Sequence, residues 1–533
     1  MTPEQIQILI SMICYMLAVI GIGIFFAKRA KQNSSNYFLG GRSLGPWVTA
    51  MSAEASDMSG WLLMGLPGVA YWCGIADAAW TAIGLAIGTY VNWLIVAKRL
   101  RNYSVASGNA ITLPEFFSNR FNEKKKVLLS ISAIFILIFF TVYAASCFVT
   151  CGKLFSALFG FDYHVMMILG AAFVIFYTFI GGFLAESASD FMQAIVMIFA
   201  LLIVLIVGIV NAGGFGAVIE NAKNIDGYLM LFGQATPNVD ANGVQIDGTF
   251  LGGTSYGAIS VLSALAWGLG YFGMPQVLLR FMAIRKADEL KRSRRIATVW
   301  VVISLFAAVL IGVVGRTVFP TELKTSSDAE NVFITLSQNL LPPLIAGVVM
   351  AGILAATISS SDSYLLIAAS AFSKNIYGGL IKKDATDKQV MLTSRIVLIV
   401  ISLIGVAIAW NENSIIFKLV SFAWAGFGAT FGPVMLLSLF WKRINQKGAV
   451  AGMITGGVTV FVWKLLLNPL GGVLAVYELL PAFILSCIVI VVVSLLTKAP
   501  DEQIVKTFEK VKDMTKNGFL GSEESVAQKS VAE

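Results

Sequence analysis

Long apolar runs recur through the whole of this 533-residue chain, and they constrain its fold more than any other feature. A run of about 20 apolar residues is long enough for an α-helix to cross the hydrocarbon core of a bilayer. Only 13% of the residues are charged, whereas a soluble protein of this length needs far more charge to cover its surface. The pattern therefore predicts an all-α polytopic membrane protein.

Hydropathy predicts about thirteen membrane spans. Their expected limits are 6–27, 47–70, 75–97, 127–157, 164–182, 190–212, 254–279, 297–319, 339–371, 391–410, 416–440, 448–468 and 476–497. The spans at 47–70 and 339–371 are the least regular, because small and polar residues interrupt both. Two consecutive blocks of five spans would have opposite orientations, as in transporters built from inverted repeats.

This pattern divides the chain into six parts. We expect a first transmembrane helix with a cytoplasmic loop (1–46), a first five-helix repeat (47–212), an extracellular loop (213–253), an inverted second repeat (254–441), two C-terminal transmembrane helices (442–498) and a cytoplasmic tail (499–533).

The basic residues gather in alternate loops. Clusters of Lys and Arg follow the first, third, seventh, ninth and eleventh spans, whereas the loop 213–253 contains a single lysine, Lys223. This alternation attributes the net charge of +8 to membrane topology rather than to a nucleic-acid partner. The positive-inside rule predicts a multi-pass protein of the cell membrane with its N-terminus outside and its C-terminus in the cytoplasm.

An acid inside the second predicted span, Asp57, is the strongest functional signal in the sequence. A carboxylate at bilayer depth is costly and usually faces a polar cavity or an ion path. The neighbouring Ser59 and Gly60, with Pro67 further on, predict a span whose backbone loosens in mid-membrane, where freed carbonyl oxygens can coordinate a cation. The alternative is a kinked helix whose acid is paired with a neighbouring donor.

The ninth span carries a run of hydroxyl groups at bilayer depth. Such a run can pack helices together, or it can bind a hard cation such as Na⁺ through oxygen. The run comprises Thr357, Ser359, Ser360, Ser361 and Ser363, with Asp362 among them.

Three further positions suggest a site for a small solute. Trp267, Tyr271 and Pro275 are spaced i, i+4, i+8 on one helical face, and the glycines between them permit local unwinding. Aromatic rings with polar tips suit the wall of such a site, although a packing stripe is the alternative.

Tyr143 belongs either to the same wall or to a hydrogen bond between helices. Asp190 is either a helix-start charge or part of an ion exit.

No enzyme signature competes with a transport function. His164 is the only histidine, the five cysteines form no CxxC motif, and no nucleophile elbow, zinc motif or phosphate-binding loop is evident. We therefore expect no catalytic activity.

Five segments carry a resemblance to the sodium/solute symporter family. They are GRSLGPWVTAMSAEASDMSGWLLMGLPG (41–68), TLPEFFSNRF (112–121), YTFIGGFLAESASDFMQA (177–194), WGLGYFGMPQVLLRFMAI (267–284) and SFAWAGFGATFGPV (421–434). The resemblance extends from the first span to the last and is strongest to bacterial proline carriers. It implies a LeuT-type core of two inverted five-helix repeats, with one extra helix before the core and two after it.

The resemblance also implies roles for individual residues. Na⁺ would be held by the backbone oxygens of Ala55, Met58 and Ala356 and by the hydroxyls of Ser359 and Ser360. Coupling to Na⁺ would require Asp57, a site shaped by Ser59 and Gly60, and Asp190 on the Na⁺ release path; Arg42 would belong to the cytoplasmic gate. The substrate would contact Tyr143, Trp267, Tyr271 and Pro275.

Two departures from the family pattern concern the substrate wall and the ion site. The proline carriers read GYFGQPH where this chain has Met274 and Gln276, and they commonly have threonine where it has Ser360. We predict a Na⁺-coupled symporter that imports a small amino acid, L-proline, by alternating access. The alternatives are a Na⁺ symporter for another small organic solute, a transporter-like membrane sensor, and an ion channel.

Overall fold

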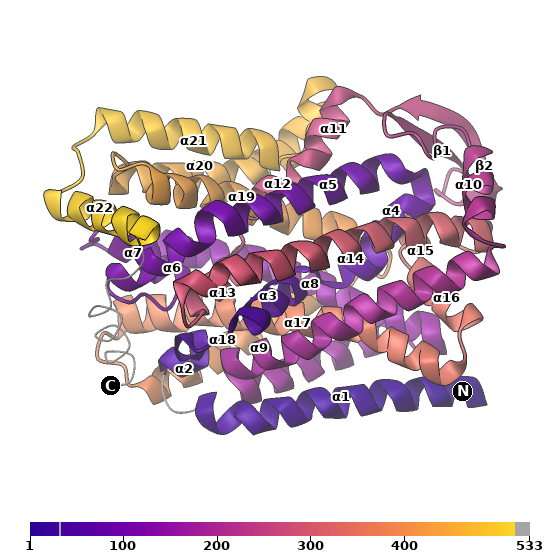
Figure 1. Cartoon of the computed structure of the whole chain (residues 1–533), viewed down its shortest axis with the longest axis horizontal. Helices are drawn as coiled ribbons and strands as arrows, with labels where there is room; N and C mark the ends of the chain where they lie inside the picture. Colours follow the sequence, from indigo (N-terminus) through magenta and orange to yellow (C-terminus); the bar gives the residue numbers. More distant parts are fainter. Residues whose placement is uncertain (31–33, 518–533) are drawn as a thin grey trace.

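The computed structural model of the chain describes residues 1–30 and 34–517. Long helices lie roughly along one direction, with a small β-hairpin at one end (Figure 1). The long helical elements are α1 (Pro3–Ala30), α3 (Pro46–Asp57), α4 (Leu66–Cys73), α5 (Ile75–Val91), α6 (Ala97–Ala106), α8 (Val127–Phe159), α9 (Tyr163–Asn211), α11 (Ala258–Leu265), α12 (Trp267–Gly270), α13 (Pro275–Ala283), α14 (Leu290–Val318), α17 (Pro343–Ser370), α18 (Asp387–Ile408), α19 (Ile416–Phe440), α20 (Gln446–Val462) and α21 (Leu479–Leu496).

Within the described residues, eleven helical segments are long and apolar enough to cross a membrane. The apolar helices Trp61–Cys73 and Tyr163–Phe179 are shorter and fall on two further predicted spans, 47–70 and 164–182. The polytopic α-helical fold is therefore confirmed, whereas the predicted count of about thirteen spans is not confirmed.

The second predicted span is broken as the sequence indicates. Helix α3 ends at Asp57, Met58 has non-helical backbone angles (φ −83°, ψ 72°), and a π-helical turn begins at Trp61 before α4. The seventh span is also interrupted, since α12 ends at Gly270 and α13 begins at Pro275. The first helix of each predicted repeat thus loses its regular backbone part-way along.

The ninth predicted span differs from expectation. Despite its run of small and polar residues, α17 is continuous from Pro343 to Ser370 and passes directly into a π-helical segment, Ala371–Ile381. Three of its hydroxyl groups, those of Thr357, Ser361 and Ser363, bond to carbonyl oxygens one turn earlier in the helix, which satisfies them without breaking it. Helix α17 packs against α9, α8, α1 and α3, and so forms the centre of the bundle.

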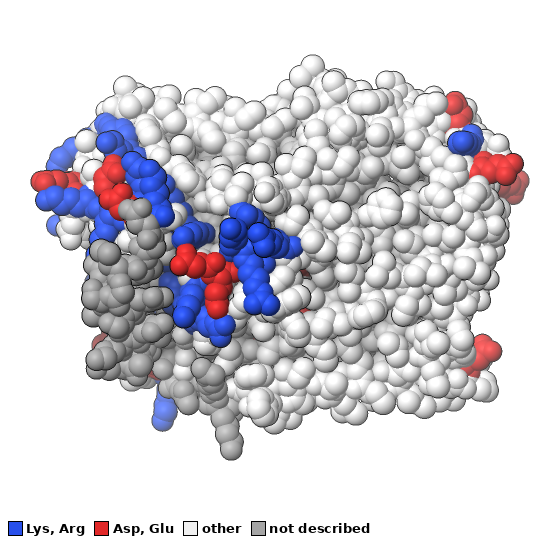
Figure 2. Space-filling view, viewed as in Figure 1, with Lys and Arg blue, Asp and Glu red and all other residues white. Residues whose placement is uncertain are grey.

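The two ends of the bundle are chemically distinct. The predicted loop 213–253 contains α10 (Phe215–Lys223) and most of an antiparallel hairpin, β1 (Gly233–Val239) with β2 (Gln245–Ser255), which the sequence reasoning missed. We call this the hairpin end. At the opposite end α22 (Glu502–Asn517) packs on α6, and there Lys and Arg side chains gather on the face seen in Figure 2. We call this the basic end.

The peripheral helices are short. They are α2 (Ser34–Leu39) and α7 (Leu113–Arg120) at the basic end, and α15 (Ser326–Ala329) and α16 (Val332–Leu340), which precede α17. The N-terminus lies at the hairpin end and the described C-terminal helix at the basic end (Figure 1).

Candidate functional site

The break after α3 places a buried acid beside the broken seventh span. Asp57 is fully buried, and its Oδ1 accepts a hydrogen bond of 3.0 Å from Gln276 Nε2 of α13. The Tyr271 hydroxyl also faces the Asp57 carboxylate, and the Tyr143 hydroxyl faces that of Ser59, whereas Gln276 Oε1 has no hydrogen-bond partner among the described residues. Burying polar groups at this depth costs free energy, so their presence at the break indicates a site that binds an ion or a polar ligand.

Gly60 allows α8 to approach the break. A Cβ at this position would lie 2.5 Å from Thr150 Oγ1 and 2.6 Å from Thr150 Cγ2. A larger residue here would require the Thr150 side chain of α8 to move, so glycine permits this close approach, and the role of Gly60 in the ion site stays a prediction.

Oxygen atoms from α3 and α17 meet beside the break. The Ser359 hydroxyl lies 2.8 Å from the Ala55 carbonyl oxygen and 3.2 Å from that of Ala356, and the Ser360 hydroxyl lies 3.3 Å from the Ala55 oxygen. The Met58 carbonyl follows the end of α3. Four of the five oxygens expected for Na⁺ are thus gathered at hydrogen-bond spacing, and all are neutral oxygen ligands of the kind that hard cations prefer. These residues fit a Na⁺ ion.

A charged cluster lies further along α3, toward its N-terminal end. Asp190 Oδ2 accepts hydrogen bonds from Ser52 (2.7 Å) and from Arg280 Nη2 (3.1 Å). The same arginine nitrogen donates to Glu186 and to Ser363, at 2.8 Å for the serine. Asp190 is therefore a fully buried partner of an arginine, not a simple helix-start charge.

The sequence reasoning missed Arg280 and Glu186. Arg280 directly follows the predicted seventh span, and Glu186 lies between the predicted fifth and sixth spans, so neither stands inside a predicted span. The sequence does contain a signal for them: each charged residue is flanked on both sides by apolar or small residues, Arg280 in VLLRFM and Glu186 in FLAESA.

Tyr143 contacts the break from α8. Its ring stacks on Tyr364 with centroids 4.2 Å apart, and its hydroxyl lies 3.5 Å from the Asp57 carbonyl oxygen. The long distance makes this a weak hydrogen bond, so the hydroxyl can exchange it for another partner.

Trp267 and Tyr271 belong to a series of contacting aromatic rings, Phe417–Trp267–Trp424–Tyr271, which we call the aromatic chain. They do not form one extended helical face with Pro275. Trp424 contacts both rings, and its Nε1 donates to the Trp267 carbonyl oxygen at 2.8 Å. Because the helix is interrupted after Gly270, Pro275 opens a separate helix and does not continue the i, i+4, i+8 face. The freed Tyr271 carbonyl oxygen accepts a hydrogen bond from Asn92 at 3.0 Å, while the Tyr271 hydroxyl faces the side chains of Asp57 and Thr89.

Met274 and Gln276 flank Pro275, and both are fully buried. Gln276 faces Asp57, as described above, so the departure from the family pattern alters the surroundings of the acid.

A hollow of about 390 Å³ opens at the hairpin end. Its wall includes Gly65, Gly68, Trp72, Asp77, Glu330, Phe417 and Lys418. Phe417 packs on Trp267 with ring centroids 5.1 Å apart, so the aromatic chain separates this hollow from Tyr271. Glu330 forms a buried ion pair with Lys153 (2.7 Å) and accepts hydrogen bonds of 3.0 Å from the first amides of α19.

The basic end is closed by contrast. Arg42 donates to Asn109 (3.0 Å), Ser104 (3.1 Å) and the Ala110 carbonyl (2.7 Å), and also to the carbonyl of Met282 at the end of α13. Burial lowers the pKa of the Arg42 guanidinium, yet each of these partners is an oxygen that needs its protons. Arg42 therefore ties together segments of this end, and its role as a gate residue stays a prediction.

Comparisons with known proteins agree with this geometry. The sequence model of the sodium:solute symporter family matches residues 37–456. Sodium/proline symporters of Staphylococcus aureus, among them those of strains USA300 and NCTC 8325, are 42% identical over 516 residues, which cover 96% of this chain and of theirs.

Two solved structures share the fold. A substrate-bound, outward-open Na⁺-coupled sialic acid symporter has a TM-score of 0.74 at 20% identity, covering 93% of this chain and 99% of that one. MhsT in complex with L-phenylalanine has a TM-score of 0.52 at 16% identity, covering 84% and 97%. The predicted LeuT-type inverted-repeat fold is confirmed.

Proposed function

This chain belongs to the sodium:solute symporter family, and on that premise we propose that it imports L-proline together with Na⁺ by alternating access. Na⁺ is the coupling ion of the family. The sodium/proline symporters that are 42% identical over nearly the whole chain support proline as the substrate. The meeting of the Ser359 hydroxyl and the Ala55 carbonyl, 2.8 Å apart beside a broken helix, carries the ion-coupling part of the proposal.

In this proposal Na⁺ is bound by Ala55, Met58, Ala356, Ser359 and Ser360, as the family resemblance implies. Neutral ligands leave the ion's positive charge uncompensated, and a nearby carboxylate stabilises it in a medium of low dielectric. Asp57 supplies that carboxylate, since it is fully buried beside the break and neutral donors alone, Gln276 and Tyr271, face it.

The substrate would lie between Tyr143 and the interrupted seventh span, against Trp267, Tyr271 and Pro275. The Tyr271 hydroxyl, which faces Asp57 and Thr89, would exchange one of these contacts for a hydrogen bond to a zwitterionic amino acid. The aromatic rings exclude water from the apolar part of a small ring such as that of proline.

The transport cycle follows from the asymmetry of the two ends. We place the hairpin end outside, because Lys and Arg gather at the opposite end (Figure 2), which puts the N-terminus outside and the C-terminus in the cytoplasm. Na⁺ and proline then enter through the hollow at the hairpin end while the Arg42 contacts hold the cytoplasmic side closed.

Opening of the inner side would release Na⁺ past Asp190. The membrane potential contributes about 2.3 kcal/mol per charge per 100 mV to inward movement of the ion. If Na⁺ tightens proline binding, proline must tighten Na⁺ binding by the same factor. The two repeats that move against each other would be 47–212 and 254–441.

Uptake of labelled proline into proteoliposomes tests the proposal. We expect uptake to need an inward Na⁺ gradient, to persist when the pH gradient is collapsed, and to be inhibited by unlabelled proline more than by a panel of other small amino acids. Uptake driven by a pH gradient without Na⁺ would exclude Na⁺ coupling. Na⁺-dependent uptake of another solute in preference to proline would keep the symporter and exclude the substrate.

A further inference from the structure

A buried tyrosine that the transport proposal does not use, Tyr364, lies against the proposed substrate wall. It belongs to α17, is fully buried, and stacks its ring on that of Tyr143 of α8, with centroids 4.2 Å apart and planes inclined by 27°. The ring of Phe140, also on α8, lies 5.1 Å from it at an inclination of 18°. Two rings of α8 therefore fix the plane of the Tyr364 ring.

The Tyr364 hydroxyl depends on Tyr143 for a partner. Shorter hydroxyl side chains of α17, such as those of Thr357 and Ser361, bond to carbonyl oxygens of their own helix. The longer tyrosine side chain carries its hydroxyl away from that helix, and the hydroxyl that it faces is that of Tyr143. Because a buried hydroxyl without a partner costs free energy, a hydrogen bond between the two is favoured.

The direction of this hydrogen bond follows from the other neighbours of Tyr143. Its hydroxyl donates weakly to the Asp57 carbonyl oxygen, 3.5 Å away, and also faces Ser59. A phenol hydroxyl has one proton to donate, so the Tyr143 oxygen accepts on the side of Tyr364, and Tyr364 is the donor. Hydrogen bonds in a chain polarise one another, so a donor behind Tyr143 makes its own proton a better donor toward the break after α3.

Tyr364 shares a face of α17 with an expected Na⁺ ligand. Residues four apart lie on one side of a helix, so Tyr364 follows Ser360 by one turn on the same face. The Ser360 hydroxyl lies 3.3 Å from the Ala55 carbonyl oxygen of α3. This face of α17 therefore meets α3 at the proposed ion site and α8 at the proposed substrate wall.

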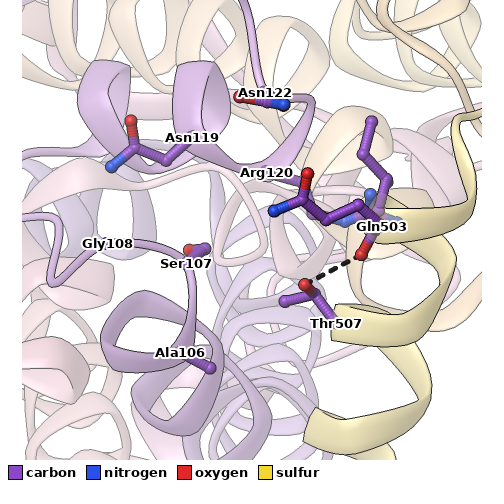
Figure 3. Close-up of a pocket in the computed structure, with 9 residues that line it drawn as sticks. Ala106, Ser107, Gly108, Asn119, Arg120, Asn122, Gln503 and Thr507 are labelled. Carbon is purple, nitrogen blue, oxygen red and sulfur yellow. Dashed lines mark hydrogen bonds between the residues drawn. The ribbon is translucent and has the colours of Figure 1, made fainter.

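The tyrosine pair is enclosed by protein. A polar hollow of about 320 Å³ at the basic end opens between the ends of α6 and α7 and the first turns of α22, where Figure 3 shows Asn119 and Gln503. Neither Tyr143 nor Tyr364 lines this hollow or the one at the hairpin end, and both are fully buried. In such an environment of low dielectric, a hydrogen bond between the two hydroxyls is stronger than it would be in water.

We propose that Tyr364 is a positioning residue for the substrate: its hydroxyl donates to Tyr143 and directs the Tyr143 proton to an acceptor oxygen of the bound amino acid. The substrate oxygen then takes the place of the Asp57 carbonyl oxygen, whose 3.5 Å contact is weak. This inference rests on the proposed function, because it places the substrate against Tyr143. Without the Tyr364 hydroxyl, the rings still stack, but the Tyr143 proton loses its fixed direction.

The substrate dependence of uptake tests the proposal. Tyr364→Phe keeps the ring and removes only the hydroxyl. We expect it to raise the half-saturating proline concentration at saturating Na⁺ about 2- to 10-fold, as for one neutral hydrogen bond, while the maximal rate per folded transporter stays close to wild type. Tyr163→Phe is the matched control: it removes another buried tyrosine hydroxyl, which donates to the Ala409 carbonyl oxygen at 2.7 Å, and it should leave the half-saturating concentration unchanged.

A double-mutant cycle shows whether Tyr364 acts through Tyr143. The combination of Tyr143→Phe and Tyr364→Phe should raise the half-saturating concentration no more than Tyr143→Phe alone. An unchanged half-saturating concentration in Tyr364→Phe, with or without a lower thermal midpoint, would overturn the proposal, and so would a double variant in which the two effects multiply. If the wild type prefers another solute to proline, the same four proteins are compared on that solute, so failure of the substrate assignment is separate from failure of this inference.

Discussion

Removal of the Ser359 hydroxyl should weaken Na⁺ activation of transport without altering the fold. This hydroxyl lies 2.8 Å from the Ala55 carbonyl oxygen across the α3–α17 contact, and in the proposed site it is one of five oxygens around the ion. Loss of one such contact in a dry site costs about 1–3 kcal/mol, which corresponds to a rise of about 5- to 150-fold in the half-saturating Na⁺ concentration.

The chain offers a matched control two residues further on. The Ser361 hydroxyl bonds to the Thr357 carbonyl oxygen within its own helix and makes no contact with α3 that would bring it to the ion. Ser361→Ala should therefore leave the Na⁺ dependence close to wild type, and Ser359→Thr, which retains a hydroxyl, should recover most of the affinity.

The assay is initial uptake of labelled proline into proteoliposomes over a range of external Na⁺, expressed per folded transporter. Folded protein is quantified by size-exclusion chromatography before reconstitution. Equal shifts for Ser359→Ala and Ser361→Ala would refute the reasoning, because they would show that any hydroxyl lost from α17 acts through packing. A normal Na⁺ curve for Ser359→Ala would refute it directly.

Three further changes follow from individual contacts. Gly60→Ala places a Cβ 2.5 Å from Thr150 Oγ1, so overpacking of about 1–3 kcal/mol should lower the thermal midpoint in detergent. Glu330→Ala leaves a buried ammonium group and two amides of α19 without their acceptor, and loss of one partner of such a pair costs about 3–5 kcal/mol, to be measured as lost folded protein at matched synthesis. Gln276→Leu removes the amide group that donates to Asp57 Oδ1 at 3.0 Å. Its loss should cost about 1–3 kcal/mol of Na⁺ binding and so raise the half-saturating Na⁺ concentration about 5- to 150-fold in the same uptake assay.

Each of these changes has its own control. Thr150→Ala in the Gly60→Ala background should recover part of the lost midpoint, and no recovery would place the clash elsewhere. An unchanged yield of Glu330→Ala would mean that solvent replaces the lost acceptor. Gln276→Asn, with a shorter amide, should behave like the leucine variant, and wild-type Na⁺ activation in both would exclude a contribution of this amide to the ion site.

The amino-acid sequence alone determined the architecture of the membrane domain. Hydropathy located every long apolar helix, and Asp57 with its small neighbours indicated the break at residues 58–60. Glycines in WGLGYFGMP likewise indicated the interruption between Gly270 and Pro275. These features are local, because helix hydrogen bonds join residues four apart and depend on the side chains in that short stretch.

Where competing local preferences were balanced, the sequence was misleading. Small and polar residues made the ninth apolar run irregular, yet several of these hydroxyls bond to their own helix and α17 is continuous. The hairpin that begins in 213–253 went unnoticed, since its strands contain glycine and proline and are interrupted by register shifts. Strands of this kind depend on their pairing partner more than on their own propensity.

Only the tertiary structure decided which buried polar groups meet. Gln276 reaches Asp57 across 219 residues, and Ser359 reaches Ala55 across 304. Arg280, which the sequence placed at a span edge, is the fully buried partner of Glu186 and Asp190. A buried polar atom takes whichever partner packing brings within about 3 Å, and that choice depends on how whole helices lie against one another. No single stretch of the chain holds this information.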